Sequence, residues 1–355
     1  MQILQVVASA NRRGAEVFGV ELGARLRACG HQVDELALGP ALPGTPSLEI
    51  AVASANGRLS PAVAARLRAV AKNADVVVGH GSRGLLGGTL STLGTDTPFV
   101  YRNIGDPRYW TATLLRRWRV GIQLRRATRV VALWPSAKTT LVQRYGLEAS
   151  KVRVIPRGVP AERFPPTSDD IRRRRRQELC LDETPVVAYV GSFTAEKRVR
   201  CAVEAVAQIP RATLVLAGDG PQRGELEALA ATVLPGRTRF LGAVADPSPV
   251  MQAADVLVLP SASEGTAGVL VEAGLTGIPC VATDVGGTSF LVQDGEGGVL
   301  VPAGSEAVEV GKGLRLALDD RDRLGGMARK RCLERFTLDT VGAAWETVLV
   351  EVANG

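Results

Sequence analysis

Short runs of β-branched and other apolar residues alternate with longer segments of helical pattern along the whole chain. In the first half, the apolar runs predict strands at residues 2–8, 32–37, 75–79, 98–102, 129–133 and 152–155. The segments between them predict helices at residues 16–29, 61–73, 85–93, 111–127 and 137–145. Because strands that alternate with helices form βαβ units, a parallel sheet covered by helices is expected.

The second half of the chain repeats this alternation. Its strands are predicted at residues 185–190, 212–217, 239–241, 255–259 and 280–283. Its helices are predicted at residues 199–208, 224–232, 248–254, 269–275, 306–318 and 321–335. Between the halves, residues 164–172 are rich in turn formers and charge, which favours a domain boundary. We therefore expect an α/β protein with two doubly wound domains that face each other across a cleft.

Length and composition agree with two domains. The chain has 355 residues, too many for one ordinary core, and 46% of them are apolar. Its five cysteines are scattered without C-x-x-C spacing, so reduced thiols in cytoplasm are expected. The first residues carry no basic leader, and no apolar run approaches the ~18 residues of a membrane span. We expect a protein that is neither exported nor membrane-spanning, and the richness in Ala, Arg, Gly and Val suggests a high-GC bacterial source.

The net charge of +7 favours anionic partners such as phosphates, acidic lipid surfaces or nucleic acid. Basic residues cluster at Arg172 to Arg176 and, with aromatic residues between them, near Trp110 and Trp118. A run of charge is often only a solvated face, and the sequence leaves that interpretation open for Arg172 to Arg176.

Small residues dominate the loops that follow the second-half strands. In a doubly wound sheet, such loops meet outside the carboxyl ends of the strands, where ligands bind. Their backbone N–H groups and the helix N-termini behind them favour a phosphate-bearing ligand. The loops in question span residues 191–197, 218–221, 261–267 and 284–289.

Three common phosphate-binding or hydrolytic classes fit poorly. No G-x-G-x-x-G opens the first βα turn, which disfavours a nicotinamide oxidoreductase, and a P-loop is absent from the sequence. The segment His80-Gly-Ser-Arg-Gly84 approaches the nucleophile elbow of hydrolases. A catalytic triad also needs a histidine late in the chain, and the sequence holds only His31 and His80.

Short motifs occur along nearly the whole chain. No single motif is decisive, but their order and spacing together are highly specific. The motifs are Gly14-Ala-Glu16, Val154-Ile-Pro-Arg-Gly-Val159, Phe164, Gly191 to Lys197, Leu216-Ala-Gly-Asp-Gly220, Phe240-Leu-Gly242, the pair Glu264 and Glu272 with seven residues between them, and Val285-Gly-Gly287. Together they resemble the motifs of the family 4 retaining glycosyltransferases.

The resemblance implies a GT-B fold of two facing Rossmann-like domains. Residues 1–165 would bind the acceptor and residues 166–335 a nucleotide-diphospho-sugar, while residues 336–355 would cross back to the first domain. Transfer of a hexosyl group, most simply from a UDP-sugar, would retain the anomeric configuration. Neither a metal nor a cofactor beyond the nucleotide-sugar co-substrate is expected.

The resemblance also assigns roles to residues. Lys197 matches a phosphate-contacting lysine, Glu264 would reach hydroxyls of the donor sugar, and Glu272 would accept hydrogen bonds from the ribose. The N–H groups of residues 265–267 would face sugar and phosphate. Catalytic candidates are Glu264, Lys197, Asn103 and His80, and donor-binding candidates are Gly14, Gly191, Ser192, Lys197, Gly218, Asp219, Gly242, Gly265, Thr266, Ala267 and Glu272.

Four positions depart from the family pattern. Ser192 replaces a common arginine, so charge compensation would rest on Lys197 alone or with help from Arg198. Asn103 replaces a histidine that contacts the donor sugar in many relatives; an amide can bind a hydroxyl but is no acid or base, and nearby His80 or Asp106 would be substitutes. The other two departures are Arg157 in place of asparagine and Phe290 in place of glutamate.

Residues 107–129 combine aromatic and apolar residues with arginines. Such a helix is typical of membrane-surface contact, which suits a lipid or lipid-linked acceptor, but it equally suits a core-facing stripe with an arginine face. We favour a small-molecule acceptor. A nucleic-acid binder and an inactive sugar-nucleotide-binding relative are the other classes considered, and nucleic acid is not expected as a partner because no recognised module appears. The sequence leaves the oligomeric state open.

Overall fold

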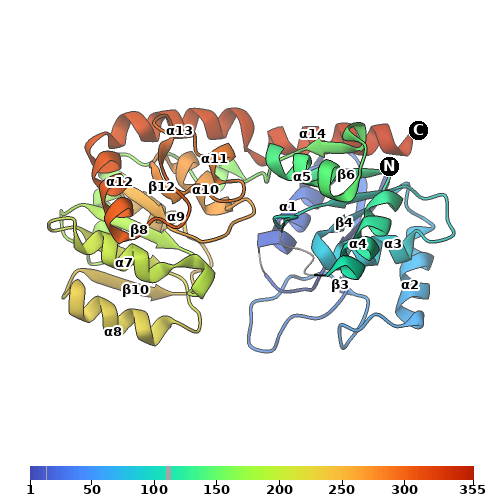
Figure 1. Ribbon diagram of the computed structural model, residues 1–355, viewed down its shortest axis with the longest axis horizontal. Coiled ribbons are helices and arrows are strands. Elements are labelled where there is room, and N and C mark those ends of the chain that lie inside the picture. Colours follow the sequence, from blue (N-terminus) through green and yellow to red (C-terminus); the bar gives the residue numbers. More distant parts are fainter. Residues whose placement is uncertain (13, 109–112) are drawn as a thin grey trace. The chain divides into compact units, whose positions relative to one another are not determined.

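The chain divides into two units in a computed structural model that describes residues 1–12, 14–108 and 113–355 (Figure 1). Unit 1 comprises Met1–Gly158 and Leu338–Gly355, and unit 2 comprises Val159–Thr337. Each unit contains one sheet whose strands are all parallel. The expected α/β class of two doubly wound domains is thus confirmed.

Unit 1 has a seven-stranded sheet with the order β3-β2-β1-β4-β5-β6-β7. The strands are β1 (Gln2–Val7), β2 (Gln32–Ala37), β3 (Ala51–Val52), β4 (Val76–His80), β5 (Phe99–Arg102), β6 (Arg129–Ala132) and β7 (Val152–Val154). The helices are α1 (Gly14–Ala28), α2 (Pro61–Ala71), α3 (Gly81–Ser91), α4 (Leu114–Arg126), α5 (Pro135–Tyr145), the 3-10 turn η1 (Ala149–Lys151) and α14 (Leu338–Ala353).

Unit 2 has a six-stranded sheet with the order β10-β9-β8-β11-β12-β13. The strands are β8 (Val186–Val190), β9 (Thr213–Ala217), β10 (Thr238–Gly242), β11 (Val256–Leu259), β12 (Cys280–Thr283) and β13 (Gly298–Val301). The helices are η2 (Ala161–Arg163), α6 (Asp169–Glu178), η3 (Ala195–Lys197), α7 (Val199–Ala207), α8 (Arg223–Val233), α9 (Ser248–Ala253), α10 (Gly268–Thr276), α11 (Thr288–Leu291), α12 (Ala307–Asp319) and α13 (Arg321–Arg335).

Both sheets share one topology. Numbered within each unit, the first six strands run 3-2-1-4-5-6, the order of the Rossmann fold. The direction of winding reverses between β1 and β4 in unit 1 and between β8 and β11 in unit 2. Because ligands of open α/β sheets bind at such reversals, the loops after these four strands are where sites are expected.

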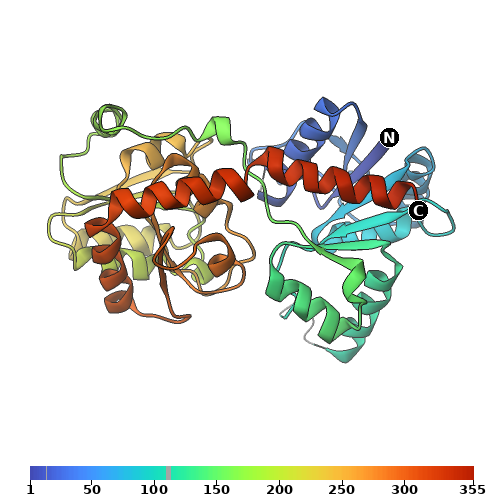
Figure 2. The same ribbon diagram turned by 90° about the horizontal axis from the view of Figure 1, so that it is seen from above.

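Helix α14 closes the core of unit 1. It packs against α1 and β4 (Figure 2), and its Trp345 is fully buried in a cluster with Ile3, Phe18 and Val76. In a partly buried contact between α14 and the turn after α1, His31 Nε2 lies 2.9 Å from a carboxylate oxygen of Glu346. Burial of a tryptophan stabilises a fold by several kcal/mol, so the C-terminal helix is an integral part of this unit.

The arginine-rich segment is a helix, α6, and part of it is buried. Ser168 caps the helix by accepting a hydrogen bond from the Ile171 N–H at 3.3 Å. Arg172 and Arg176, four residues apart on one face, are buried against Asp255. A solvated basic face, the interpretation that the sequence left open, is therefore wrong for these two arginines.

None of the helices in the described ranges has the length and apolar character that crossing a bilayer needs.

Candidate functional site

A buried carboxylate lies where two loops of unit 2 meet. The Nζ of Lys197, at the end of η3, donates to Glu264 Oε1 in the loop after β11 at 2.7 Å. The hydroxyl of Ser261 donates to the same oxygen, also at 2.7 Å. The Glu264 side chain is only 8% exposed and the Lys197 side chain 22%. Since both charges are largely shielded from water, their attraction exceeds that of a surface pair.

Backbone contacts hold these loops in place. The Ala262 N–H donates to the Glu196 carbonyl at 2.7 Å, which ties the loop after β11 to the loop after β8. The Gly287 N–H donates to the Gly265 carbonyl at 2.9 Å. Gly286 has φ +58°, and a Cβ there would meet the Glu264 carbonyl oxygen at 1.8 Å, so only glycine fits. Three loops therefore fix the backbone around Glu264.

Other donor-binding candidates of unit 2 lie at or just after the ends of the strands β8, β9 and β10. Gly191, Ser192, Gly218 and Asp219 line one hollow of about 320 Å³. Gly242 borders it, since its carbonyl accepts from the Gly218 N–H at 2.7 Å. The hollow opens at the carboxyl ends of β8 and β9, where the sequence predicted a phosphate-bearing ligand.

Helix α10 begins directly after the loop that carries Glu264. Ala267 is its N-cap residue and provides no side-chain cap, and Gly265 and Thr266 precede it. Such a helix N-terminus favours an anion because its first N–H groups lack intrahelical acceptors. Glu272 lies in the second turn of this nine-residue helix and is half-buried.

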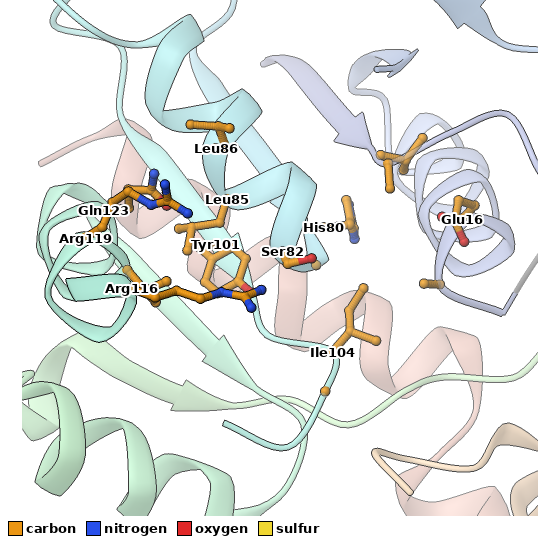
Figure 3. A pocket seen from close by; sticks show the side chains of 16 residues that line it. Glu16, His80, Ser82, Leu85, Leu86, Tyr101, Ile104, Arg116, Arg119 and Gln123 are labelled. Atoms are coloured by element: carbon orange, nitrogen blue, oxygen red, sulfur yellow. The ribbon is translucent and has the colours of Figure 1, made fainter. Parts of the chain in front are cut away.

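Unit 1 contains a cavity of about 620 Å³ at its own winding reversal (Figure 3). The residues around it come from β1, α1, β4, α3, the end of β5 and α4. Glu16 and His80 line the side nearest α1, whereas Arg116 and Arg119 project from α4 on the other side (Figure 3). Apolar side chains, including Leu85, also line the cavity.

His80 is a buried, neutral base at one side of this cavity. It is 2% exposed, its Nε2 lies 2.8 Å from Gln5 Oε1, and its ring stacks on Trp345. Burial, reinforced by the nearby Arg102 guanidinium, holds the pKa of His80 well below its usual range. The imidazole is therefore uncharged at neutral pH.

This shift makes the stability of the protein depend on pH. Above about pH 6.5 the imidazole is neutral in both the folded and the unfolded chain. Below that pH the unfolded chain takes up a proton that folded His80 resists, so stability is lost as pH falls. We expect the melting temperature of the His80→Gln variant to fall less steeply than that of the wild type between about pH 7 and pH 5. Parallel profiles in the two proteins would contradict this account.

Asn103 lies beside the cavity without lining it. Its side chain is fully buried, and neither side-chain polar atom has a hydrogen-bond partner among the described residues. Its N–H donates to the Val131 carbonyl at 2.8 Å, which extends the pairing of β5 with β6. Its neighbours Ile104 and Gly105 line the cavity.

Arg102 is a buried cation that the sequence did not single out. It is 1% exposed, its guanidinium lies 3.9 Å from the centre of the Phe18 ring, and its Nε and Nη1 have no hydrogen-bond partner among the described residues. Burial, together with the nearby charge of Arg157, lowers the pKa of Arg102 to about 9, and Glu16 opposes this shift. Its position in the sequence could have revealed it, because Arg102 ends a strand that is otherwise apolar.

The structure also locates the departures from the family pattern. The Arg157 guanidinium lies against Gly14 in unit 1, and Phe290 packs edge-on against Phe336 in unit 2. Arg198, the suggested helper of Lys197, instead pairs with Glu306 at 3.3 Å.

Asp106, the suggested alternative to His80, is bound by the Arg108 guanidinium at 2.6 Å. Within the described ranges, no three His, Cys, Asp or Glu side chains gather in a way that could hold a metal ion. The aromatic residues Tyr109 and Trp110, part of the expected amphipathic helix, lie outside the described residues.

Two family models match most of the chain. Residues 12–163 match "Glycosyltransferase Family 4", and residues 184–320 match "Glycosyl transferases group 1". The 2-deoxystreptamine glucosyltransferase of Streptomyces kanamyceticus is 35% identical over 59% of this chain and 54% of its own length. The alpha-D-kanosaminyltransferase of the same organism is 30% identical over 68% of this chain and 64% of its own length. The matched part thus spans less than two thirds of either relative.

The fold matches a solved structure over its whole length. HepE from Anabaena, solved in complex with UDP and glucose, superimposes with a TM-score of 0.85. The match covers 99% of both chains at 23% sequence identity, which establishes the likeness of the folds. The chain therefore has the GT-B fold and belongs to glycosyltransferase family 4.

Proposed function

We propose that this protein is a retaining, metal-independent glycosyltransferase that moves a hexosyl group from a UDP-sugar to a hydroxyl of a small-molecule acceptor. The observation that carries the proposal is the Lys197–Glu264–Ser261 cluster at the winding reversal of unit 2. Family membership supports the reaction class. The UDP and glucose bound to HepE support the donor, and the name of the 2-deoxystreptamine glucosyltransferase supports a small polar acceptor.

In this proposal, the residues of unit 2 hold the donor. The diphosphate lies against Lys197 and the N-terminus of α10, the sugar hydroxyls bind Glu264, and the ribose hydroxyls bind Glu272. A carboxylate accepts hydrogen bonds from hydroxyls, whereas a lysine stabilises the charge that develops on a leaving diphosphate. The Lys197–Glu264 ion pair therefore holds both groups ready before the donor arrives.

The reaction needs no base from the protein. The acceptor oxygen attacks the anomeric carbon from the face that the diphosphate leaves, the carbon–oxygen bond to the diphosphate breaks, and the acceptor proton passes to the departing diphosphate oxygen. The products are the glycosylated acceptor and UDP. Neutral His80, which lines the cavity of unit 1, then serves as a hydrogen-bonding group for sugar or acceptor hydroxyls.

Thermal unfolding with nucleotides tests the donor. UDP and UDP-sugars are expected to raise the melting temperature more than GDP, dTDP or ADP and their sugars, because ligand stabilisation follows the ratio of concentration to Kd. The Glu272→Ala variant should lose most of this shift. The Glu264→Ala variant should keep the shift with UDP but lose turnover. If no nucleotide stabilises the wild type, the proposed function is wrong.

Turnover separates the enzyme from an inactive relative, a rival motivated by Ser192 and Asn103. Release of UDP from a labelled UDP-sugar, in the presence of a panel of polyol and aminocyclitol acceptors, measures it directly. Binding of the donor without any transfer or hydrolysis would favour the inactive relative.

A lipid or lipid-linked acceptor is the second candidate, favoured by one observation on α4. Leu114, Leu115 and Trp118 are 82%, 75% and 63% exposed, which leaves apolar area in water at the surface of unit 1. Exposed apolar side chains flanked by arginines suit the surface of an anionic bilayer.

A further inference from the structure

The cavity of unit 1 is bordered by an uncompensated positive charge. Between Asp106 and Glu148 the sequence has nine basic residues and no acidic one. The charge of this stretch therefore exceeds the net charge of +7 of the whole chain. Helix α4 lies within this stretch, so no carboxylate of α4 or α5 neutralises its arginines. The field on this side of the cavity therefore favours an anion.

Two of these arginines line the cavity. Arg116 extends from α4 past Tyr101 toward Ser82, and Arg119 lies one turn further along the helix (Figure 3). Neither arginine makes an ion pair with any described residue. Most other guanidinium groups of α4 are engaged elsewhere: that of Arg117 donates to the Arg144 carbonyl at 2.7 Å, and that of Arg125 donates to the Tyr145 carbonyl at 3.2 Å.

The opposite side of the cavity has different chemistry. Glu16 is buried there on α1, and His80 is neutral (Figure 3). A carboxylate and a neutral imidazole both form hydrogen bonds with hydroxyl groups. The carboxylate repels anions, and the neutral imidazole has no charge that attracts them. The cavity thus has a hydroxyl-binding side at α1 and an anion-binding side at α4, with Leu85 and Val120 among the apolar residues around it.

We propose that the acceptor carries a phosphate group, which Arg116 and Arg119 bind while the acceptor hydroxyl lies toward Glu16 and His80. This inference rests on the proposed function and specifies its acceptor. Arginine suits phosphate because its planar guanidinium donates two parallel hydrogen bonds to adjacent oxygens. The same chemistry is supplied by a soluble phosphorylated polyol or by a lipid headgroup. Arg116 and Arg119 also line a second hollow of about 270 Å³, together with Leu115 and Trp118, which is where the apolar part of a lipid would lie.

Calorimetric titration of the full chain, saturated with UDP, tests the phosphate site. Glucose 6-phosphate is expected to bind more tightly than glucose. Arg116→Gln and Arg119→Gln should each weaken glucose 6-phosphate binding about tenfold, since a hydrogen bond to a charged group contributes about that factor. Arg117→Gln is the matched control, because it removes the same charge from the same helix but outside the cavity. The affinity of this variant for glucose 6-phosphate should stay close to that of the wild type.

A parallel measurement identifies the source of the phosphate. Sedimentation with vesicles of phosphatidylcholine alone, or mixed with phosphatidylglycerol, tests the lipid headgroup in the same four proteins. Binding to the mixed vesicles that is lost in the two cavity variants but not in Arg117→Gln supports a lipid source. Binding of glucose 6-phosphate with the same pattern supports a soluble source.

Two results would overturn the inference. One is the absence of any preference, both for glucose 6-phosphate over glucose and for mixed over neutral vesicles. The other is an Arg117→Gln variant that loses as much affinity for glucose 6-phosphate or mixed vesicles as Arg116→Gln does. Binding of the phosphate would then depend on overall charge and not on the cavity. The melting temperature with UDP, measured on the same samples, reports the donor site of unit 2. If UDP does not raise the melting temperature, the proposed function is overturned. If UDP raises it but no phosphate binds, only the inference about the acceptor is overturned.

Discussion

Replacing Lys197 with alanine is expected to lower the turnover of glycosyl transfer by about 10²–10³-fold. The departing diphosphate gains negative charge in the transition state, and a preorganised cation in a shielded site supplies stabilisation of that size. Ser192 brings no charge to the loop after β8 and Arg198 is paired with Glu306, so we assign this role to Lys197, which lies against Glu264. Steady-state release of UDP from UDP-glucose measures the loss.

A matched variant separates catalysis from general effects of charge. Arg200 follows in α7, pairs with Glu204 and Glu225 on the surface, and is exposed. Arg200→Ala should leave turnover close to that of the wild type, because exposed ion pairs contribute little. Equal turnover losses in the two variants would argue against a catalytic role of Lys197. A far-UV circular dichroism melt of each variant confirms that the comparison is made on folded protein.

Replacing Asp255 with alanine is expected to lower the free energy of unfolding of unit 2 by about 3–5 kcal/mol. Asp255 is 5% exposed and accepts from Arg176 Nη2 at 2.6 Å, from Arg321 Nη1 at 2.8 Å and from the Val186 N–H at 2.8 Å. Without the carboxylate, a buried guanidinium and a strand N–H lose their partner. Burial, together with the nearby charge of Arg321, lowers the pKa of Arg172, and the Asp255 carboxylate opposes this shift.

The positions of the tryptophans allow the unfolding of the two units to be measured separately. All four tryptophans, Trp110, Trp118, Trp134 and Trp345, belong to unit 1, so their fluorescence reports that unit alone. In a denaturant titration, Asp255→Ala should shift the transition seen by far-UV circular dichroism by more than the transition seen by fluorescence. Asp170→Ala, which removes an exposed partner of Arg173, should shift neither by more than about 1 kcal/mol. If the Asp255→Ala variant is as stable as the Asp170→Ala variant, Asp255 does not stabilise unit 2 as the buried partner of Arg176 and Arg321.

Local pattern predicted the elements well because strands and helices differ in the spacing of apolar residues. The predicted strand at residues 280–283 is β12 without change, and the predicted helix at 321–335 is α13. The prediction was less accurate where small residues were taken for a loop. Helix α3 begins at Gly81 rather than near residue 85, because glycines let it pack closely on the sheet: a Cβ at Gly88 would lie 2.0 Å from the Phe99 ring.

Edge elements and charged helices were missed for a related reason. Strand β13 follows a glycine-rich turn and is fixed by its pairing with β12, which no local pattern reveals. Helix α6 was taken for a linker because of its charge. Two of its arginines are buried only because Asp255, distant in sequence, supplies a partner.

The sequence by itself determined the class of the fold, the positions of the loops that end the strands and the membership of the family, because these depend on local spacing and on the order of motifs. Only the tertiary structure decided which side chains meet. It pairs Lys197 with Glu264 across 67 positions of the chain, buries Arg102 and His80, and gathers Arg116 and Arg119 at the cavity of unit 1. Burial, ion pairing and cavity shape arise from contacts between distant segments, and those contacts exist only once the sheets have formed.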